Sequence, residues 1–132
     1  MQRALPFVLF ITLLLPASSS TASCLATAQT QAAMNECANS DFESADRQLN
    51  LDYKKIIGRL DAPGQTSFRK AQEAWIKFRD SECEFRSSGV QGGSVYPMVY
   101  GECLAELTTK RLADFKYYLT CEEGDLSCVT HP

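Results

Sequence analysis

Six cysteines constrain the fold of this chain more than any other feature of its sequence. They are Cys24, Cys37, Cys83, Cys103, Cys121 and Cys128. An even number of cysteines in a small exported protein indicates a disulfide framework, here of three bonds. The first 23 residues supply the export route, because they contain one basic residue, an apolar block from Leu5 to Leu15, and then Pro16 and small residues. This pattern is that of a cleavable secretory signal peptide, residues 1–23.

The signal peptide also sets the domain organisation. Its apolar block is shorter than the about 20 residues that a membrane span needs, so cleavage after Ala22 or Ser23 should leave a mature chain without a transmembrane segment. Residues 24–132 are enough for one domain with one modest core. Lipid anchoring at Cys24 is disfavoured, because Thr21 replaces the aliphatic residue of a lipoprotein signal and lipidation would leave an odd number of thiols. We therefore expect an exported protein, either periplasmic or secreted.

The charge of the mature chain restricts its partners. Removal of Arg3 with the signal leaves 12 basic and 16 acidic side chains, so the formal charge changes from -3 to 12 - 16 = -4. A mildly acidic protein is a poor ligand for nucleic acids and for anionic membranes. A basic protein is the partner that this charge favours.

The first long stretch with helical periodicity runs from Met34 to Leu60. Its apolar positions recur every three or four residues and are Met34, Ala38, Phe42, Ala45, Leu49, Tyr53, Ile56 and Leu60. This spacing predicts one amphipathic helix that continues through the cap-forming residues 39–41. Residues 61–64 contain Pro63 and are expected to end it, with a second helix starting near Thr66 or Ser67.

Two further helices follow from the same kind of pattern. The expected apolar face of the second is Phe68, Ala71, Trp75, Phe78 and Phe85, and residues 87–89 mark its end. Residues 87–97 contain three glycines and a proline without sustained periodicity, which indicates a loop. The third helix should contain Pro97 in its first turn and bury Leu104, Thr108, Leu112, Phe115 and Leu119.

These elements predict an all-α fold, an antiparallel three-helix bundle stapled by disulfides, with residues 120–132 as a short disulfide-closed tail. A helix of about 20 residues is about 30 Å long, whereas bonded cysteines have Cα atoms within about 7 Å. Only cysteines at the same end can therefore pair, which joins Cys121 to Cys128. Among the other four the pairing stays open, and we prefer Cys24 with Cys37 and Cys83 with Cys103.

The stretch AQEAWIKFRDSEC, residues 71–83, invites two interpretations. In the first, Trp75 packs in the core and Arg79 lies along it, with its guanidinium paired to a carboxylate on another helix. In the second, Arg79 binds a carboxylate ligand and Asp80 acts as a base. We favour the structural interpretation of Trp75, Arg79 and Asp80, because consecutive helical residues point about 100° apart, which argues against Arg79 and Asp80 as partners in a site.

Catalysis finds little support in the sequence. The single histidine, His131, is the penultimate residue, so nothing would hold it in a catalytic triad. A zinc site would need thiolates that export should oxidise, and no Cys-x-x-Cys occurs. Paired carboxylates for glycoside hydrolysis need a cleft that a small bundle hardly offers. We expect no catalytic residue, no metal and no cofactor, and therefore no enzyme.

The glycine-rich loop is the better candidate for binding. Flexible backbone at Gly92 and Gly93, followed by Ser94, Tyr96 and Tyr100, is a combination common in binding surfaces. The alternative is that both tyrosines cover the core where the third helix begins. Sequence alone leaves the two interpretations open.

Three segments in order carry a resemblance to a known family. They are TQAAMNECANSDFESADRQLNLDYKKII, AQEAWIKFRDSEC and GGSVYPMVYGECLAELTTKRLADF. Together they resemble the small exported domain of LprI-type lysozyme inhibitors over essentially the whole mature chain. The matching positions are Cys24, Cys37, Trp75, Arg79, Asp80, Cys83 and Cys103.

The resemblance implies a helical, disulfide-bonded envelope protein that inhibits lysozyme. On this hypothesis the chain binds a basic lysozyme and occludes its active-site cleft, with the tyrosine-containing loop as the inserted part. The alternative is a non-inhibitory periplasmic adaptor or structural module that binds another envelope protein. The resemblance transfers no catalytic or contact residue.

Overall fold

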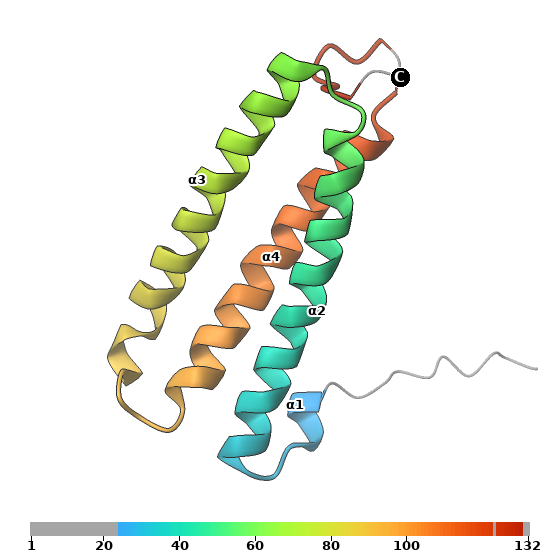
Figure 1. Cartoon of the computed structure of the whole chain (residues 1–132). Helices are drawn as coiled ribbons and strands as arrows, with labels where there is room; N and C mark the ends of the chain where they lie inside the picture. The colour runs from blue at the N-terminus through green and yellow to red at the C-terminus, as the bar shows by residue number, and fades with distance from the viewer. Residues whose placement is uncertain (1–23, 123, 131–132) are drawn as a thin grey trace, which may run out of the picture.

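The structure is a computed structural model and describes residues 24–122 and 124–130. Most of these residues are helical (Figure 1). The elements in order are α1 (Cys24–Thr27), α2 (Gln31–Ile57), α3 (Ala62–Ser87), the 3₁₀ helix η1 (Ser88–Val90) and α4 (Tyr96–Thr120). These residues contain no strand. The chain runs along α2, returns along α3 and runs along α4 in the first direction (Figure 1). The predicted signal peptide, residues 1–23, and His131 lie outside the described residues.

Side chains from the preceding residues cap the first two long helices. Thr30 Oγ1 accepts a hydrogen bond from the Ala33 N–H at 3.1 Å at the start of α2. Asp61 Oδ1 accepts one from the Gly64 N–H at 2.9 Å at the start of α3. As predicted, α2 continues through residues 39–41.

The expected start of the second helix near Thr66 or Ser67 is wrong, because α3 already begins at Ala62. Pro63 belongs to its first turn, where the missing N–H would have no helical partner anyway and the fixed φ suits the helix. The proline therefore starts α3 instead of ending α2. The end of α2 comes earlier, at Ile57, before the turn at Gly58.

Helix α4 is central, and α2 is the helix that lies closest along it. At one point the two backbones nearly touch, because a Cβ added to Gly101 would lie 3.2 Å from the Cβ of Ala38. The α2 and α3 backbones hardly approach each other. They meet mainly through side chains such as Tyr53 and Phe68, whose rings stack with centroids 5.2 Å apart. The predicted three-helix bundle is thus found in part, with a fourth helix, α1, added to it.

Two clusters form the interior. The first lies towards the end where α2 joins α3 and consists of Leu49, Ile56, Phe68 and Phe115. The second lies towards the other end and consists of Cys83, Cys103 and Leu104, with Phe42, Tyr100 and Leu107 packed against it. The apolar faces predicted for the first and third helices supply most of these residues.

The apolar face predicted for the second helix is wrong in part. Phe68 is buried and Trp75 half-buried, but Ala71, Phe78 and Phe85 are exposed, with 56% of Phe78 and 75% of Phe85 accessible. The face that α3 buries consists of Phe68, Gln72, Arg79, Cys83 and Ser87. Phe78 directly precedes Arg79 and therefore points about 100° away from that face.

Three disulfides close the structure. They join Cys24 to Cys37, Cys83 to Cys103 and Cys121 to Cys128, with Cα atoms 5.5, 5.5 and 5.6 Å apart. The Cys121–Cys128 bond is the one that the lengths of the helices required, and the other two are the pairs that we preferred among the four cysteines left open.

Candidate functional site

Arg79 lies at the middle of the bundle, between aromatic rings of two helices. Its guanidinium carbon is 5.1 Å from the centroid of Phe42 on α2 and 5.3 Å from that of Trp75 on α3. On α4, the Arg111 guanidinium lies 5.7 Å from Trp75 and 5.1 Å from Phe115. Cation–π contacts of desolvated guanidinium groups are stronger than those at the surface. The tryptophan is thus contacted by both arginines, and the two cations link all three long helices.

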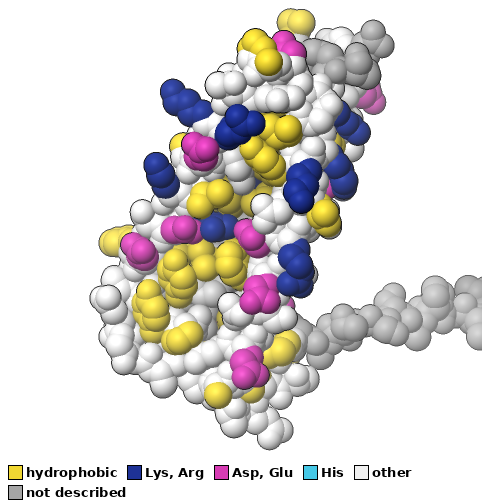
Figure 2. All heavy atoms as spheres, in the orientation of Figure 1, with side chains coloured by type: hydrophobic (Ala, Val, Ile, Leu, Met, Phe, Trp, Pro, Cys, Tyr) yellow, Lys and Arg dark blue, Asp and Glu magenta, His cyan; other side chains and the backbone are white. Residues whose placement is uncertain are grey.

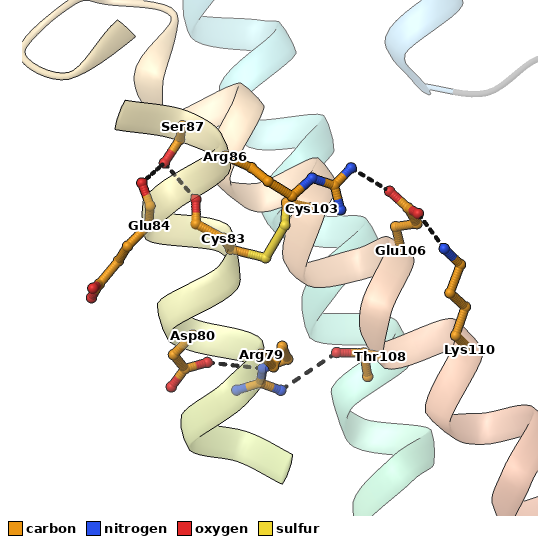
Figure 3. Close-up of a disulfide and its surroundings, with 10 residues drawn as sticks. All are labelled: Arg79, Asp80, Cys83, Glu84, Arg86, Ser87, Cys103, Glu106, Thr108 and Lys110. Carbon is orange, nitrogen blue, oxygen red and sulfur yellow. Dashed lines mark hydrogen bonds and ion pairs between the residues drawn. A yellow bond between two sulfur atoms is a disulfide. The ribbon is translucent and has the colours of Figure 1, made fainter. Parts of the chain in front are cut away.

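The Arg79 guanidinium donates hydrogen bonds to three side chains. Its Nε donates to Asp80 Oδ1 at 2.9 Å, and its Nη1 donates to Asp46 Oδ1 at 3.3 Å and to Thr108 Oγ1 at 3.4 Å. Figure 3 shows Arg79 between Asp80 and Thr108. The expectation that Asp80 points away from Arg79 is wrong, because the long arginine side chain bends back far enough to reach its neighbour's carboxylate.

This arrangement is suited to holding helices together and poorly suited to chemistry. The Arg79 side chain is only 8% exposed, and its donors face groups of the protein itself. The Asp80 carboxylate is engaged by Arg79 in an ion pair at 2.9 Å. The geometry fits the structural interpretation of Trp75 and Arg79. Figure 2 shows hydrophobic side chains gathered on the face between α3 and α2, with a basic side chain between acidic ones at mid-height.

The candidate binding loop is well defined in the structure. Gly92 has φ 79°, a value that favours glycine, and the Gly93 N–H donates to the Val90 carbonyl at 3.0 Å. Asn35 on α2 donates from Nδ2 to the Ser94 carbonyl at 3.1 Å, which ties the loop to the neighbouring helix. The side chains of residues 91–94 remain exposed. The loop therefore presents a fixed backbone to solvent.

Tyr96 and Tyr100 lie in the first turns of α4 and not in the loop. Their rings stack with centroids 5.8 Å apart and an angle of 11° between their planes. Tyr100 packs against the cluster that contains the Cys83–Cys103 disulfide. Desolvation, followed by the charges of Asp80 and Glu84, raises the pKa of the Tyr100 hydroxyl. Tyr100 thus covers the core, and Tyr96 lies stacked on it at the edge.

A feature that our sequence interpretation missed becomes apparent once the ends of the helices are assembled. Residues 24–35 and residues 87–101 contain no Asp, Glu, Lys or Arg. The fold brings both segments to the same end, since α1 and the start of α2 lie beside the loop before α4 (Figure 1). We call this end without charged side chains, residues 24–35 and 87–101, the neutral tip. Its signal in the sequence is the absence of charge over 15 consecutive residues, from 87 to 101.

Charged groups begin directly beside the neutral tip. Arg86 on α3 donates to Glu106 on α4 at 2.9 Å, and Lys110 pairs with the same carboxylate (Figure 3). Hydrogen bonds from Lys110 and Arg86 lower the pKa of Glu106. The Cys83–Cys103 disulfide connects the same two helices beside this ion pair, since Cys83 lies about one turn before Arg86 on α3 and Cys103 about one turn before Glu106 on α4. The tip is therefore held by a disulfide and by an ion-pair network across its base.

The described residues include no group of three or more His, Cys, Asp or Glu side chains placed to hold a metal ion. Within residues 24–122 and 124–130, no helix has the length and hydropathy needed to cross a bilayer.

Comparisons with known proteins point to one family. A family model described as "Lysozyme inhibitor LprI" matches residues 23–115. The chain is also 34% identical over 110 residues to the uncharacterized protein R02472 of Rhizobium meliloti (strain 1021), an alignment that covers 74% of this chain and 79% of that protein. No solved structure matches the chain.

Proposed function

Because the chain belongs to the LprI family of lysozyme inhibitors, we propose that the exported protein binds a lysozyme and occludes its active-site cleft with the neutral tip. The observation that carries this proposal is the lack of charged side chains, and of carboxylates in particular, at the tip. Its two segments form an end of the molecule that displays exposed backbone, small side chains and Tyr96.

The chemistry of lysozymes explains why an uncharged tip is suitable. Glycosidases of this kind use two carboxylates on either side of the scissile bond. A carboxylate inserted beside them would add like-charge repulsion, which disfavours a complex by several kcal/mol. A tip without Asp or Glu avoids this repulsion and can still donate and accept hydrogen bonds through its backbone.

The rest of the surface favours association with a basic enzyme. The mature chain carries a formal charge of -4, and its acidic side chains lie outside the neutral tip. Opposite net charges accelerate the encounter of two proteins, and this acceleration becomes smaller as the salt concentration increases. We therefore expect the association rate with a basic lysozyme to fall with ionic strength, while the dissociation rate changes little.

The test is a titration of lysozyme turnover on cell-wall substrate with the oxidised mature protein. Saturating inhibition at one inhibitor per enzyme is the expected result. Two variants of the exposed Ser94 test whether the tip lies beside the carboxylates of the enzyme. S94E should weaken inhibition by about tenfold or more through like-charge repulsion, whereas S94K should weaken it much less.

The matched control is Ser44→Glu, because Ser44 is also exposed but lies on α2 outside the neutral tip. S44E should inhibit like the wild type. Equal losses in S94E and S94K would show that the tip touches the enzyme away from its carboxylates. Equal inhibition by all variants would place the contact elsewhere on the protein.

A second candidate function is supported by a different surface. Phe78 and Phe85 lie two turns apart on the outer side of α3 and are more than half exposed. Exposed aromatic pairs on one helix face suit a groove in a partner protein. A non-inhibitory envelope adaptor would use this ridge. Absence of inhibition across lysozyme classes, together with loss of a partner in the F78S/F85S double variant, would favour this function.

A further inference from the structure

The structure contains a pocket at the end opposite the neutral tip, which the proposed inhibition does not use. It lies between the first turns of α3, the second half of α4 and the C-terminal tail, and its volume is about 670 Å³. Pockets of about 300 to 1,000 Å³ are typical of small-molecule sites. Its walls are mostly apolar and include Leu60, Phe68, Ala71, Tyr118 and Val129.

Two arginines give this apolar pocket a positive side. Arg111 is held in place by a hydrogen bond to Gln72 Oε1 at 3.2 Å and by an ion pair with Asp114 at 3.2 Å. Arg59 donates from Nη1 to the Leu119 carbonyl, a neutral acceptor, at 2.8 Å. Among the described residues that line the pocket, Asp61 is the one carboxylate, and it is engaged in capping α3. Although Asp114 balances the charge of Arg111, the charge of Arg59 faces a neutral acceptor, and this favours an anionic ligand group.

The tail forms a fixed wall of the pocket. The Cys121–Cys128 disulfide closes it into a loop, and the Tyr117 hydroxyl donates to Asp125 Oδ2 at 2.7 Å. The Thr130 hydroxyl donates to the Tyr118 carbonyl, and both Cys128 and Thr130 are buried. Val129, between them, is 53% exposed and lines the pocket. The tail thus holds at the pocket an apolar side chain of which more than half is exposed.

From these contacts we propose that the pocket binds a single-chain amphiphile with an anionic head group, of the fatty-acid type. The acyl chain lies along Phe68, Tyr118 and Val129, and the head group lies beside Arg59 and Arg111. The same chemistry is presented by free fatty acids and by anionic lipids of a bilayer, and the experiment distinguishes these two sources.

The probe is dodecanoate, added in monomeric form to the oxidised mature protein and followed by calorimetry. Trp75 provides a second readout, since the Arg111 guanidinium lies 5.7 Å from its ring and a ligand that engages Arg111 changes the surroundings of the indole. The expected result is saturable binding of one dodecanoate with a change in tryptophan emission. Absence of saturable binding, both of dodecanoate and of vesicles, overturns the proposal.

A pair of matched variants tests the location. Ala71 and Ala74 are both exposed on α3, but only Ala71 lines the pocket. A71L fills the pocket and should weaken dodecanoate binding by about tenfold or more, whereas A74L should bind like the wild type. Thermal unfolding of each variant establishes that it is folded. Equal binding by A71L and A74L overturns the assigned location.

Two further ligands test the head group and the source. Dodecanol has the same chain without the charge and should bind at least about tenfold more weakly; equal binding overturns the anionic assignment. Sedimentation with phosphatidylglycerol vesicles identifies the source. If the wild-type protein sediments with the vesicles and the A71L variant does not, the proposal is supported and bilayer lipid is the source. If the protein binds monomeric dodecanoate but not the vesicles, the proposal is supported and free fatty acid is the source.

Discussion

The two helices that flank α4 are attached to it in different ways. Helix α2 packs through small and apolar residues, with Ala38 against Gly101 and with Leu49 and Ile56 in one cluster with Phe115. Helix α3 turns Gln72, Arg79 and Ser87 inward, three polar residues that are all buried. It is joined to α4 by the Cys83–Cys103 disulfide, and two of its three phenylalanines, Phe78 and Phe85, are exposed.

The difference shows that burial of apolar surface is only one way to attach a helix. The α2–α4 contact gains stability from removal of apolar surface from water and from close packing. The α3–α4 contact also buries Phe68 beside Phe115. In addition it depends on a covalent bond, on hydrogen bonds and on guanidinium groups next to rings, which require specific orientations. Helix α3 should therefore be the part whose attachment is lost first when such specific contacts are removed.

The largest effect should come from the disulfide between α3 and α4. The double variant C83S/C103S opens a link between residues 20 apart, which should lower the free energy of unfolding by about 3 kcal/mol. Denaturant titration measures this loss, and hydrogen exchange should show α3 amides losing more protection than α2 amides. The control is C121S/C128S, whose link spans 7 residues. Equal loss of protection in α2 and α3 would contradict the comparison.

A second prediction concerns the close α2–α4 contact. Gly101→Leu places a side chain where a Cβ alone would lie 3.2 Å from Ala38, and overpacking of this kind destabilises by about 1 to 3 kcal/mol. Gly89→Leu is the matched control, because a Cβ at Gly89 meets nothing within 4 Å. Chemical denaturation of both variants gives the two free energies. If G101L is as stable as G89L, the helices are not held at their closest distance by this glycine.

The arginine at the centre of the α3 contacts gives a smaller effect. Arg79→Met keeps most of the stem but removes the charge beside Phe42 and Trp75, so unfolding should become easier by about 1 to 2 kcal/mol. Asp46 and Asp80 limit the loss, because their side chains are 38% and 43% exposed and can be hydrated. Arg69→Met, at an exposed position of the same helix, serves as the control. An R79M protein as stable as R69M would show that the cation contributes nothing.

The smallest effect is the pH dependence of stability that Tyr100 causes. Tyr100 lies where residues of α3 and α4 meet. Its folded-state pKa is raised by desolvation and by Asp80 and Glu84, so the folded protein retains this proton more firmly than the unfolded chain. The stability that it contributes is present below the unfolded tyrosine pKa of about 10 and is lost as the pH rises through the folded value. Unfolding free energies at alkaline pH should therefore fall less steeply in Y100F than in the wild type. The same slope in both proteins would assign the effect to other groups.

Much of the fold could be predicted because the sequences of α2 and α4 each contain a single apolar face. Their periodicity identifies Leu49, Ile56, Leu104 and Phe115 as interior positions, and the lengths of the helices then limit which cysteines can pair. For α3 the same method fails, because its sequence has two apolar stripes, one through Phe68 and Trp75 and one through Phe78. Spacing within one helix cannot show which of the two stripes faces α4.

The burial of Arg79 was harder to predict, because its partners come from distant segments. Phe42 and Asp46 precede it by more than 30 residues and Thr108 follows it by 29. Without them a buried guanidinium would be strongly unfavourable, since a buried charge needs compensation. The neutral tip was missed for a related reason, because it combines two segments, 24–35 and 87–101, that are neighbours only in the folded chain. Its role, like those of Tyr96 and Tyr100, stays a prediction.

The neutral tip and the tail pocket lie at opposite ends of the helices. A helix of 27 residues, such as α2, is about 40 Å long, so the helices act as a rigid spacer between the two ends. A lysozyme seated on the tip and an acyl chain in the pocket would not compete for space. A molecule held at a lipid surface by its tail would then present its tip about 40 Å away from that surface, within reach of enzymes that approach the cell wall.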